Sequence, residues 1–204
     1  LNMEKDSICL VTGANAGLGL AAACSIAAAG ATVVMLCRNK ERGEKALAKV
    51  RALGGRADLM LCDLADIADV EAFCARFLAK YHRLDVLINN AGVLSPRRCE
   101  TKQGRELHFG VNHLGHFLLT MRLLPLIKKS APSRIVVVAS CAHKLARIHF
   151  HDIDLTKGYN VWRGYAQSKL ANVMFAQTLA QKLADSGVAV NSLNPGVIAS
   201  DIVA

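Results

Sequence analysis

The sequence predicts an α/β fold, with a doubly wound, Rossmann-type parallel sheet flanked by helices on both faces. Short apolar runs rich in β-branched residues alternate with longer helical stretches along the chain. Strands buried on both faces of a parallel sheet have this composition. Every connection between successive strands contains a helix, so we expect right-handed crossovers. The length of 204 residues suits a single domain, residues 1–204.

Six strands are expected to alternate with five helices. The predicted strands are Ile8–Thr12, Thr32–Cys37, Ala57–Cys62, Asp85–Asn89, Arg134–Ser140 and Val188–Leu193. The predicted helices are Leu18–Ala29, Lys40–Leu53, Ile67–Tyr81, Thr101–Lys128 and Arg163–Asp185. With no later strand beside it, Val188–Leu193 is expected to form an unpaired edge of the sheet.

A glycine-rich turn joins the first predicted strand to the first predicted helix. It reads Thr12-Gly13-Ala14-Asn15-Ala16-Gly17-Leu18-Gly19. Glycines permit a tight turn and a close approach of backbone to phosphate, and the helix N-terminus supplies free N–H groups. The turn predicts a site for the pyrophosphate of a dinucleotide, formed by Gly13, Asn15, Gly17, Leu18 and Gly19. A purely structural glycine turn is the alternative.

The spacing G-x-x-x-G-x-G resembles the glycine motif of the short-chain dehydrogenase/reductase family rather than the G-x-G-x-x-G of other dinucleotide folds. Asn89-Asn90-Ala91-Gly92 is similar to that family's N-N-A-G motif, and Asp63-Leu64 resembles its acidic-aliphatic pair beside the adenine ring. Both stretches follow strands, where ligands bind in open α/β sheets. The resemblance implies cofactor contacts from Asp63, Leu64, Asn90, Ala91 and Gly92.

The end of the second predicted strand indicates which nicotinamide cofactor binds. NAD-binding sheets usually place an acid there, which accepts hydrogen bonds from the ribose 2′-OH. This chain has Arg38 and Lys40 instead, with Arg42 close behind. A 2′-phosphate would find charge-assisted partners here, and Arg38 suits a bidentate contact. We therefore expect NADP(H) rather than NAD(H), while a solvated arginine at a helix start is the alternative.

Tyr165 and Lys169 form a Y-x-x-x-K pair on a predicted helix. Positions i and i+4 share a face, so the lysine is expected beside the phenol. A free phenol has a pKa of about 10 and is a poor acid-base group at neutral pH. A nearby ammonium and a positively charged nicotinamide are expected to lower that pKa, so that Tyr165 can exchange a proton with a substrate oxygen.

Three further stretches match the family pattern in the correct order. Ser140 resembles the serine that orients the substrate oxygen, although Ala139 stands where many members have another serine. Asn112, in Asn112-His113-Leu114-Gly115, resembles the asparagine that supports a water linking the lysine to solvent. Asn194-Pro195-Gly196 resembles the turn that packs on the nicotinamide, and Ser200 stands where the family often has a threonine contacting the carboxamide. The resemblance implies catalytic roles for Asn112, Ser140, Tyr165 and Lys169, and cofactor contacts from Tyr165, Lys169, Pro195, Gly196 and Ser200.

Composition and residue spacing restrict the partners, metals and cellular locations to be expected. The net charge is +9, from 25 Lys and Arg against 16 Asp and Glu, but the basic residues are scattered and aromatics make up 5%, so no nucleic-acid partner is expected. The seven cysteines include no C-x-x-C pair, which favours an intracellular, reducing compartment. The histidines near residues 108–116 and 143–151 lack convincing zinc spacing, so no metal is expected. The uncharged stretch 7–37 is interrupted by glycines and is interpreted as a β-α-β unit rather than a membrane span.

Several stretches resemble the retinol dehydrogenase branch of the family, notably Cys37-Arg38-Asn39, Arg147-Ile148-His149-Phe150 and Ser168-Lys169-Leu170-Ala171-Asn172. That branch implies hydride transfer between NADP(H) and the carbonyl or alcohol carbon of a lipophilic substrate such as a retinoid. Most soluble members of the wider family pair through the helices that correspond to Thr101–Lys128 and Arg163–Asp185, so the resemblance allows a homodimer, although members of the branch that are tied to membranes differ from this pattern. The branch also allows peripheral membrane association and a location in the cytoplasm or on the cytosolic face of the endoplasmic reticulum.

The family pattern continues past Ser200 into a substrate-binding helical lobe, a seventh strand and a final helix, which we expect to be missing here. Weak or poorly selective turnover is the expected consequence. The alternative is a non-catalytic NADP-binding short isoform or fragment that acts through protein interaction.

Overall fold

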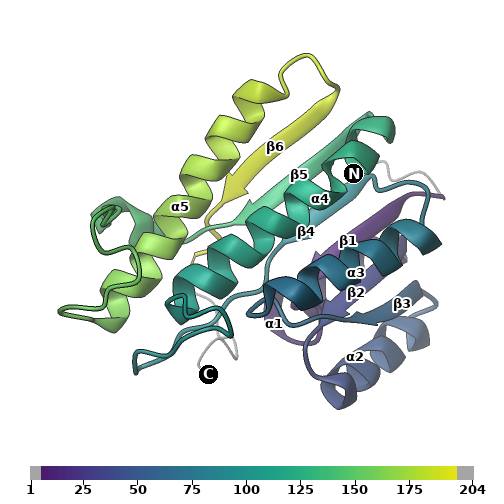
Figure 1. Cartoon of the computed structure of the whole chain (residues 1–204). Coiled ribbons are helices and arrows are strands. Elements are labelled where there is room, and N and C mark those ends of the chain that lie inside the picture. Colours follow the sequence, from purple (N-terminus) through teal and green to yellow (C-terminus); the bar gives the residue numbers. More distant parts are fainter. Residues whose placement is uncertain (1–5, 197–204) are drawn as a thin grey trace.

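The computed structural model describes residues 6–196 and contains one six-stranded parallel sheet in the order β3-β2-β1-β4-β5-β6 (Figure 1). The order reverses next to β1, as in doubly wound folds, and the predicted fold class is confirmed. The strands are β1 (Ile8–Thr12), β2 (Thr32–Cys37), β3 (Arg56–Leu61), β4 (Val86–Asn89), β5 (Ser133–Val138) and β6 (Val188–Leu193).

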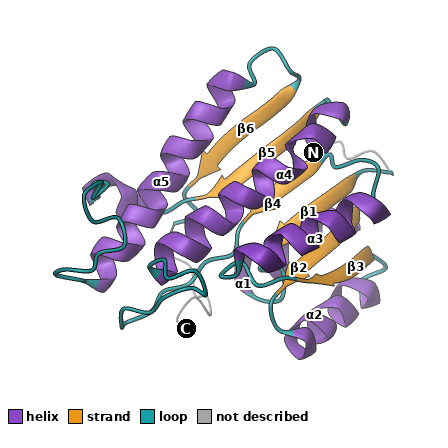
Figure 2. Ribbon diagram, viewed as in Figure 1, coloured by secondary structure: helices purple, strands orange, loops and turns teal. Residues whose placement is uncertain are grey.

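Helices cover both faces of the sheet (Figure 2). Apolar side chains of α3, α4 and α5 form a large core on one face, and those of α1 and α2 form a smaller core on the other. The central strand β1 lies between them and contributes Leu10 to the first core and Val11 to the second, as alternation along a strand requires. The helices are α1 (Gly17–Ala28), α2 (Lys40–Ala52), α3 (Ile67–Lys80), α4 (His116–Lys129) and α5 (Val161–Lys182).

The predicted helix Thr101–Lys128 was wrong at its start. Residues 101–106 form a turn, in which Thr101 N–H donates to the Arg105 carbonyl. Helical structure begins at residue 107 and passes through a π-helical segment, Phe109–Gly115, into α4. The physical reason is the Glu106 carboxylate, which accepts hydrogen bonds from the N–H groups of His108 and Phe109 and so caps the helix there.

The fifth strand is also shorter than predicted. It ends at Val138, and Ala139 makes one further backbone hydrogen bond, to the Leu193 carbonyl. Ser140 instead caps a short 3₁₀ helix, Cys141–Leu145, by accepting from the Ala142 N–H. Ser140 therefore lies just beyond the carboxyl edge of the sheet, where a ligand can reach it.

Three further predictions concern the whole chain. Within residues 6–196, β6 has a neighbour on one side only, as predicted. All seven cysteines lie in this range and none is in a disulfide. None of the helices described has both the length and the apolar character needed to cross a bilayer.

Candidate active site

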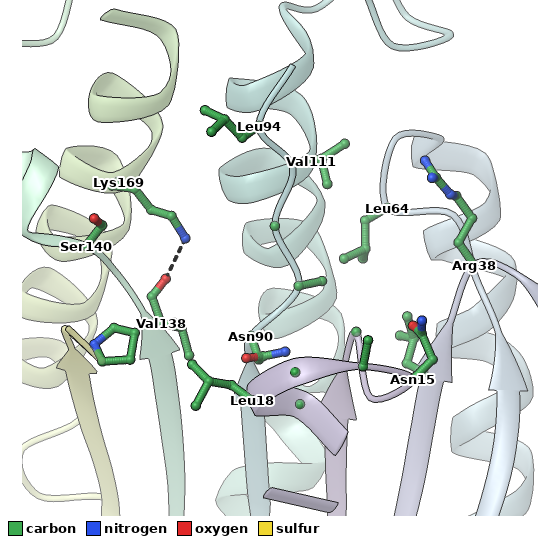
Figure 3. A pocket seen from close by; sticks show the side chains of 18 of the residues that line it. Asn15, Leu18, Arg38, Leu64, Asn90, Leu94, Val111, Val138, Ser140 and Lys169 are labelled. Carbon is green, nitrogen blue, oxygen red and sulfur yellow. Dashed lines mark hydrogen bonds between the residues drawn. The ribbon is translucent and has the colours of Figure 1, made fainter. Parts of the chain in front are cut away.

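A cavity of about 430 Å³ opens at the carboxyl ends of the strands, where the loops after all six strands, β1 to β6, converge. Figure 3 shows Arg38 and Asn15 towards one end of this cavity and Ser140 and Lys169 towards the other. Of the predicted residues, Asn112 is buried beside the cavity rather than lining it, and Ser200 lies outside the described residues. The predicted residues that line it are Gly13, Asn15, Gly17, Leu18, Gly19, Arg38, Asp63, Leu64, Asn90, Ala91, Gly92, Ser140, Tyr165, Lys169, Pro195 and Gly196.

The glycine turn is packed too closely for side chains. Gly13 and Gly17 have φ of +64° and +50°, a region that favours glycine. A Cβ on Gly19 would lie 2.2 Å from the Gly13 carbonyl oxygen and 2.6 Å from Asn90 Nδ2. The turn leads directly into α1, so the free N–H groups of that helix face the cavity. This arrangement fits a bound pyrophosphate.

The hydroxyl of Thr12 holds the glycine turn against the loop after β4. It accepts from the N–H groups of Asn90 and Ala91, both at 2.9 Å, while Asn90 Nδ2 donates to the Thr12 carbonyl at 2.8 Å. His116 Nε2 lies 2.8 Å from the same hydroxyl. Asn90 therefore acts here through its amide and backbone, holding the shape of the turn.

His116 connects this network to the buried main chain of Asn112. Its Nδ1 lies 3.0 Å from the Asn112 carbonyl, which can only accept, so Nδ1 bears the proton and Nε2 accepts from Thr12. Burial lowers the pKa of His116 to about 4, which keeps the ring neutral at ordinary pH. Sequence reasoning missed Thr12 and His116 because their roles come from contacts between distant segments.

Two arginines line the cavity at the end of β2. Arg38 is exposed and follows the strand directly, and Arg42 lies on the first turn of α2. Asn39 caps this helix by accepting from the Arg42 N–H at 2.9 Å. The cap places Arg38 and Arg42 on the same side of the cavity, where both can meet a phosphate.

The acidic-aliphatic pair is fixed by local contacts. Asp63 Oδ1 accepts from the Ala65 N–H at 3.0 Å, and the Asp63 N–H donates to Asp69 at 2.8 Å. Leu64 is buried and packs on Gly115, where a Cβ would lie 2.5 Å from the Leu64 carbonyl oxygen. Close packing of the π-helical segment thus holds Leu64 at the cavity wall.

The helix α5 carries the two residues of the predicted Y-x-x-x-K pair. Asn160 caps this helix by accepting from the Trp162 N–H at 2.9 Å. The Lys169 Nζ lies 5.6 Å from the centre of the Tyr165 ring and donates to the Val138 carbonyl at 3.0 Å, the dashed contact in Figure 3. The helix and the end of β5 therefore bring phenol and ammonium together, as the spacing predicts.

Burial changes both ionisation equilibria. It lowers the pKa of Lys169 to about 8, because the ammonium loses its hydration. Burial also raises the pKa of Tyr165, against a hydrogen bond with Ser140 that lowers it. Without a bound cofactor, burial dominates and favours the protonated phenol; the lowering expected from Lys169 together with a positively charged nicotinamide stays a prediction.

Asn112 is held by hydrogen bonds to both its side chain and its main chain. Its side chain accepts from the Val93 N–H at 2.8 Å and donates to Ser168 Oγ at 3.1 Å. Its main-chain carbonyl oxygen accepts from Asn172 Nδ2 at 2.9 Å and from His116 Nδ1 at 3.0 Å. These contacts join Asn112 to α5, which carries Lys169; its support of a relay water stays a prediction.

Apolar residues complete the cavity near Tyr165. Leu94, Val111 and Trp162 line it, and Trp162 is 64% exposed. Sequence reasoning did not select them, because isolated apolar residues carry no motif. Because they line the same cavity as Ser140 and Lys169, they are candidates for contacts with a bound ligand.

The family model for "short chain dehydrogenase" matches residues 7–204. The chain belongs to the short chain dehydrogenase family. Among solved structures, this family member is similar to an uncharacterized protein of Mycobacterium paratuberculosis, with 38% identity, a TM-score of 0.83, and coverage of 93% of this chain and 68% of that one. A short chain dehydrogenase of Shigella flexneri complexed with NADP is 30% identical, with a TM-score of 0.78 and coverage of 96% and 79%.

Retinol dehydrogenases are among the relatives of this short chain dehydrogenase. Human retinol dehydrogenase 11 is 46% identical over 198 residues, which are 96% of this chain and 62% of that protein. Mouse retinol dehydrogenase 14 is 44% identical over 205 residues, with coverage of 95% and 61%. The predicted retinol dehydrogenase-like branch is confirmed. This chain spans 62% of the length of the human relative.

Proposed function

We propose that this chain is an oxidoreductase that transfers hydride between NADP(H) and the carbonyl or alcohol carbon of a lipophilic substrate. One observation carries the proposal: a single cavity holds the glycine turn and Arg38 together with Ser140, Tyr165 and Lys169. The first group suits a phosphorylated dinucleotide and the second suits proton exchange with an oxygen.

The residues present fit a nicotinamide dinucleotide with a 2′-phosphate. The glycine turn lines the cavity and is too tight for a Cβ on Gly19, so that backbone rather than side chains would face the pyrophosphate. Arg38 and Arg42 would hold the 2′-phosphate, and Asp63 and Leu64 lie where the adenine ring would pack. Bound there, the cofactor supplies the hydride acceptor or donor. The NADP complex of the similar Shigella protein supports the choice of NADP(H) over NAD(H).

Three side chains of the chain would manage the substrate oxygen. Ser140 lies at the cavity wall and would orient the carbonyl oxygen by a hydrogen bond. Tyr165, whose pKa is raised by burial, would hold a proton at its phenolic oxygen and give it to a developing alkoxide. Lys169 would stabilise the phenolate left behind, because its ammonium lies beside the ring.

The apolar lining favours a lipophilic substrate. Leu18, Leu94, Val111 and Trp162 contribute apolar surface to the cavity, and no acid other than Asp63 lines it among the described residues. Retinol dehydrogenases 11 and 14 are similar proteins whose names specify a lipophilic alcohol. A retinoid or another lipophilic alcohol or aldehyde is therefore the proposed substrate class.

The test is NADPH consumption by the purified chain with a panel of aldehydes that includes retinal. We expect turnover by the wild type, and Tyr165→Phe should lose more than about 100-fold in kcat, because the proton donor is gone while the binding surfaces persist. Cofactor fluorescence measures NADPH binding in parallel. Binding without turnover in folded wild-type protein would contradict catalysis and favour a cofactor-binding protein that acts through interaction.

We further propose a homodimer and a reducing location. Phe117 and Met121 of α4 and Met174 of α5 are each more than 40% exposed, and the rings of Phe117 and Phe175 lie 5.2 Å apart across the two helices. This continuous apolar face suits a second copy. The free cysteines favour a reducing compartment, in the cytoplasm or on the cytosolic face of the endoplasmic reticulum with peripheral membrane association.

A further inference from the structure

A buried acid–histidine pair lies beside the start of α5 and has no part in the proposed chemistry. The side chains of Glu106 and His108 are completely buried, and Glu106 Oε1 lies 2.7 Å from His108 Nδ1. Burying ionisable groups costs free energy unless their polar atoms are hydrogen-bonded. Their partners therefore indicate what the pair holds in place.

Hydrogen bonds determine the protonation states of Glu106 and His108. Burial raises the pKa of Glu106, but hydrogen bonds from His108 and from the Phe109 N–H outweigh it, so that the net pKa is lowered and the carboxylate is favoured. His108 Nε2 accepts from the Ser95 N–H at 2.9 Å. Because a backbone N–H can only donate, the proton of the neutral ring is on Nδ1 and points to Glu106.

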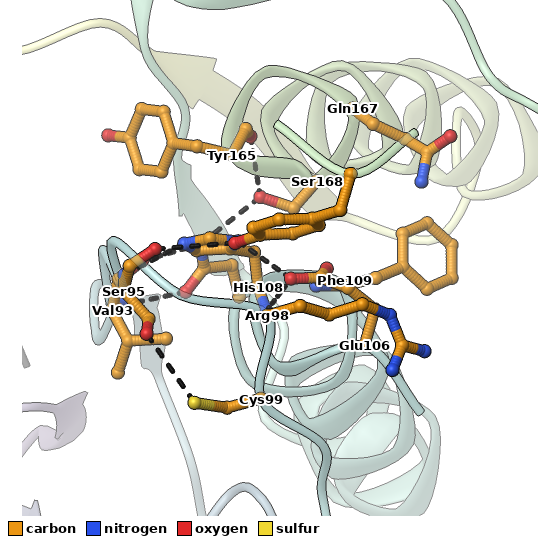
Figure 4. A network of polar contacts seen from close by, with 12 residues as sticks. Val93, Ser95, Arg98, Cys99, Glu106, His108, Phe109, Tyr165, Gln167 and Ser168 are labelled. Atoms are coloured by element: carbon orange, nitrogen blue, oxygen red, sulfur yellow. Dashed lines mark hydrogen bonds and ion pairs between the residues drawn. The ribbon is translucent and has the colours of Figure 1, made fainter. Parts of the chain in front are cut away.

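The His108 ring contacts both α5, the helix that carries Tyr165, and the segment Leu94–Ser95 at the wall of the cavity. Its edge meets the Tyr165 ring, with centroids 6.2 Å apart and planes at 83°. Its face lies parallel to the Tyr159 ring at 6.4 Å, and the Tyr159 hydroxyl donates to the Ser95 carbonyl at 3.3 Å. Ser95 directly follows Leu94, which lines the cavity. Figure 4 shows the polar contacts that join these segments.

Gly164 shows how tightly α5 packs on Glu106 and His108. A Cβ at this position would lie 2.9 Å from His108 Nδ1 and 3.2 Å from Glu106 Oε1. The residue immediately before Tyr165 therefore sits directly on the pair. The location of the first turn of α5, and with it the Tyr165 ring, depends on these two side chains.

We propose that Glu106 and His108 are positioning residues that set the Tyr165 ring and the Leu94 wall of the cavity relative to each other. This inference rests on the proposed function. Glu106 fixes the tautomer and orientation of His108; the ring edge supports Tyr165, and Nε2 anchors Ser95. The pair couples the proton donor to the substrate-contacting wall without touching the substrate.

Steady-state kinetics of His108→Asn and His108→Gln separate the contact of His108 with Glu106 from its contact with Ser95. In His108→Asn the amide can still donate to Glu106 but does not reach Ser95, whereas in His108→Gln the amide oxygen can accept from the Ser95 N–H. We expect His108→Asn to lower kcat by about tenfold or more and to raise the aldehyde KM, because small misplacements of a catalytic group are costly. His108→Gln should restore KM towards the wild-type value. The Kd of NADPH should stay within about twofold, since the pair is remote from Arg38.

A second measurement does not need turnover. In protein labelled with ¹³C-tyrosine, the ring resonance that disappears in Tyr165→Phe belongs to Tyr165. We expect it to shift in His108→Asn and in Gly164→Ala, and to stay in place in the control His82→Gln, whose side chain is exposed. If the wild type shows no turnover but the Tyr165 resonance shifts, the proposed function fails and the positioning role stands.

Two outcomes would overturn the inference. One is a folded His108→Asn protein with wild-type kcat, KM and Tyr165 resonance. The other is an equal loss of NADPH affinity and activity in His108→Asn and His108→Gln, which would show a general loss of structure. Circular dichroism and thermal unfolding of each variant establish that the proteins compared are folded.

Discussion

Arg38 is the side chain on which the choice of cofactor depends. It is exposed at the cavity wall, where the acid typical of NAD-binding sheets is missing. Arg38→Ala should weaken NADPH binding by roughly 10-fold to 100-fold, the size of one or two charge-assisted hydrogen bonds, and leave NADH binding nearly unchanged. Fluorescence titration with NADPH and with NADH measures the ratio of the two dissociation constants.

Arg134→Ala is the matched control for this substitution, because Arg134 is exposed at the opposite end of the sheet, near the start of β5. It should change neither affinity. An equal loss of NADPH and NADH affinity in Arg38→Ala would show that the arginine does not read the 2′-phosphate.

Lys169 makes the stability of the protein depend on pH. Burial lowers its pKa from 10.5 to about 8. Between these values the unfolded chain binds more protons than the folded one, so this group makes the free energy of unfolding rise with pH. Below about pH 8 both states are protonated and the whole cost of burying the ammonium is present.

Comparison with Lys169→Met isolates this contribution. Denaturant unfolding at a series of pH values should show the wild type gaining up to roughly 3 kcal/mol relative to the variant from about pH 7 to above pH 10. Subtracting the free energy of unfolding of Lys169→Met at each pH cancels the contributions of the other groups that titrate in this range, including the buried cysteines. A difference independent of pH would mean that Lys169 is hydrated in the native state.

The residues of the site divide into those with a sequence signature and those without one. Tyr165, Lys169 and the glycine turn follow from spacing, because a helix or a tight turn places fixed intervals together. Thr12–His116 has none, because the two residues are 104 positions apart and meet only in the folded chain. Glu106 and His108 are close in sequence, but their contacts with Ser95 and Gly164 follow from no motif. The burial that raises the pKa of Tyr165 was not predicted either, because charge spacing can be read from a sequence but burial cannot.

At the scale of elements, the junction between β1 and α1 determines whether a phosphate can bind. Gly19→Ala would place a Cβ 2.2 Å from the Gly13 carbonyl oxygen, so the backbone has to move. We expect the Kd of NADPH to rise by more than about tenfold, along with a loss of roughly 1–3 kcal/mol in stability.

The exposed helix position Ala21 provides the control. Ala21→Gly costs about 1 kcal/mol of helix propensity but leaves the turn intact. It should therefore unfold more easily than the wild type and bind NADPH with the same affinity. Wild-type affinity in Gly19→Ala would show that the close packing of the turn is not required.

Strand and helix order followed from the alternation of apolar runs, but two boundaries did not. The start of the helix leading into α4 depends on the buried Glu106 carboxylate, which accepts from two backbone N–H groups. Sequence pattern alone shows a glutamate near a helical stretch and not its burial. Likewise, β5 ends at Val138, two residues before the predicted end at Ser140, because Ser140 caps the 3₁₀ helix Cys141–Leu145 and the apolar run Val136–Ala139 does not show where pairing stops.

At the scale of the whole molecule, the apolar face of α4 and α5 predicts a dimer. Sedimentation velocity should give a dimer for the wild type and a monomer for Met121→Lys, because a charge at the centre of an apolar interface is left unpaired. Leu53→Lys, on a residue 65% exposed at the end of α2, should stay dimeric. A monomeric wild type would contradict the proposed interface.

The central proposal is that NADPH bound in the cavity gives its hydride to a carbonyl carbon while Tyr165 provides the proton. The most direct test is isotope transfer: the chain is incubated with retinal and NADPH deuterated at the transferred position, and the alcohol product is analysed by mass spectrometry. We expect deuterium on the carbinol carbon, with the labelled alcohol forming more than about 100-fold faster with the wild type than with Tyr165→Phe. Alcohol without deuterium, or equal rates of labelling by the two proteins, would contradict this proposal.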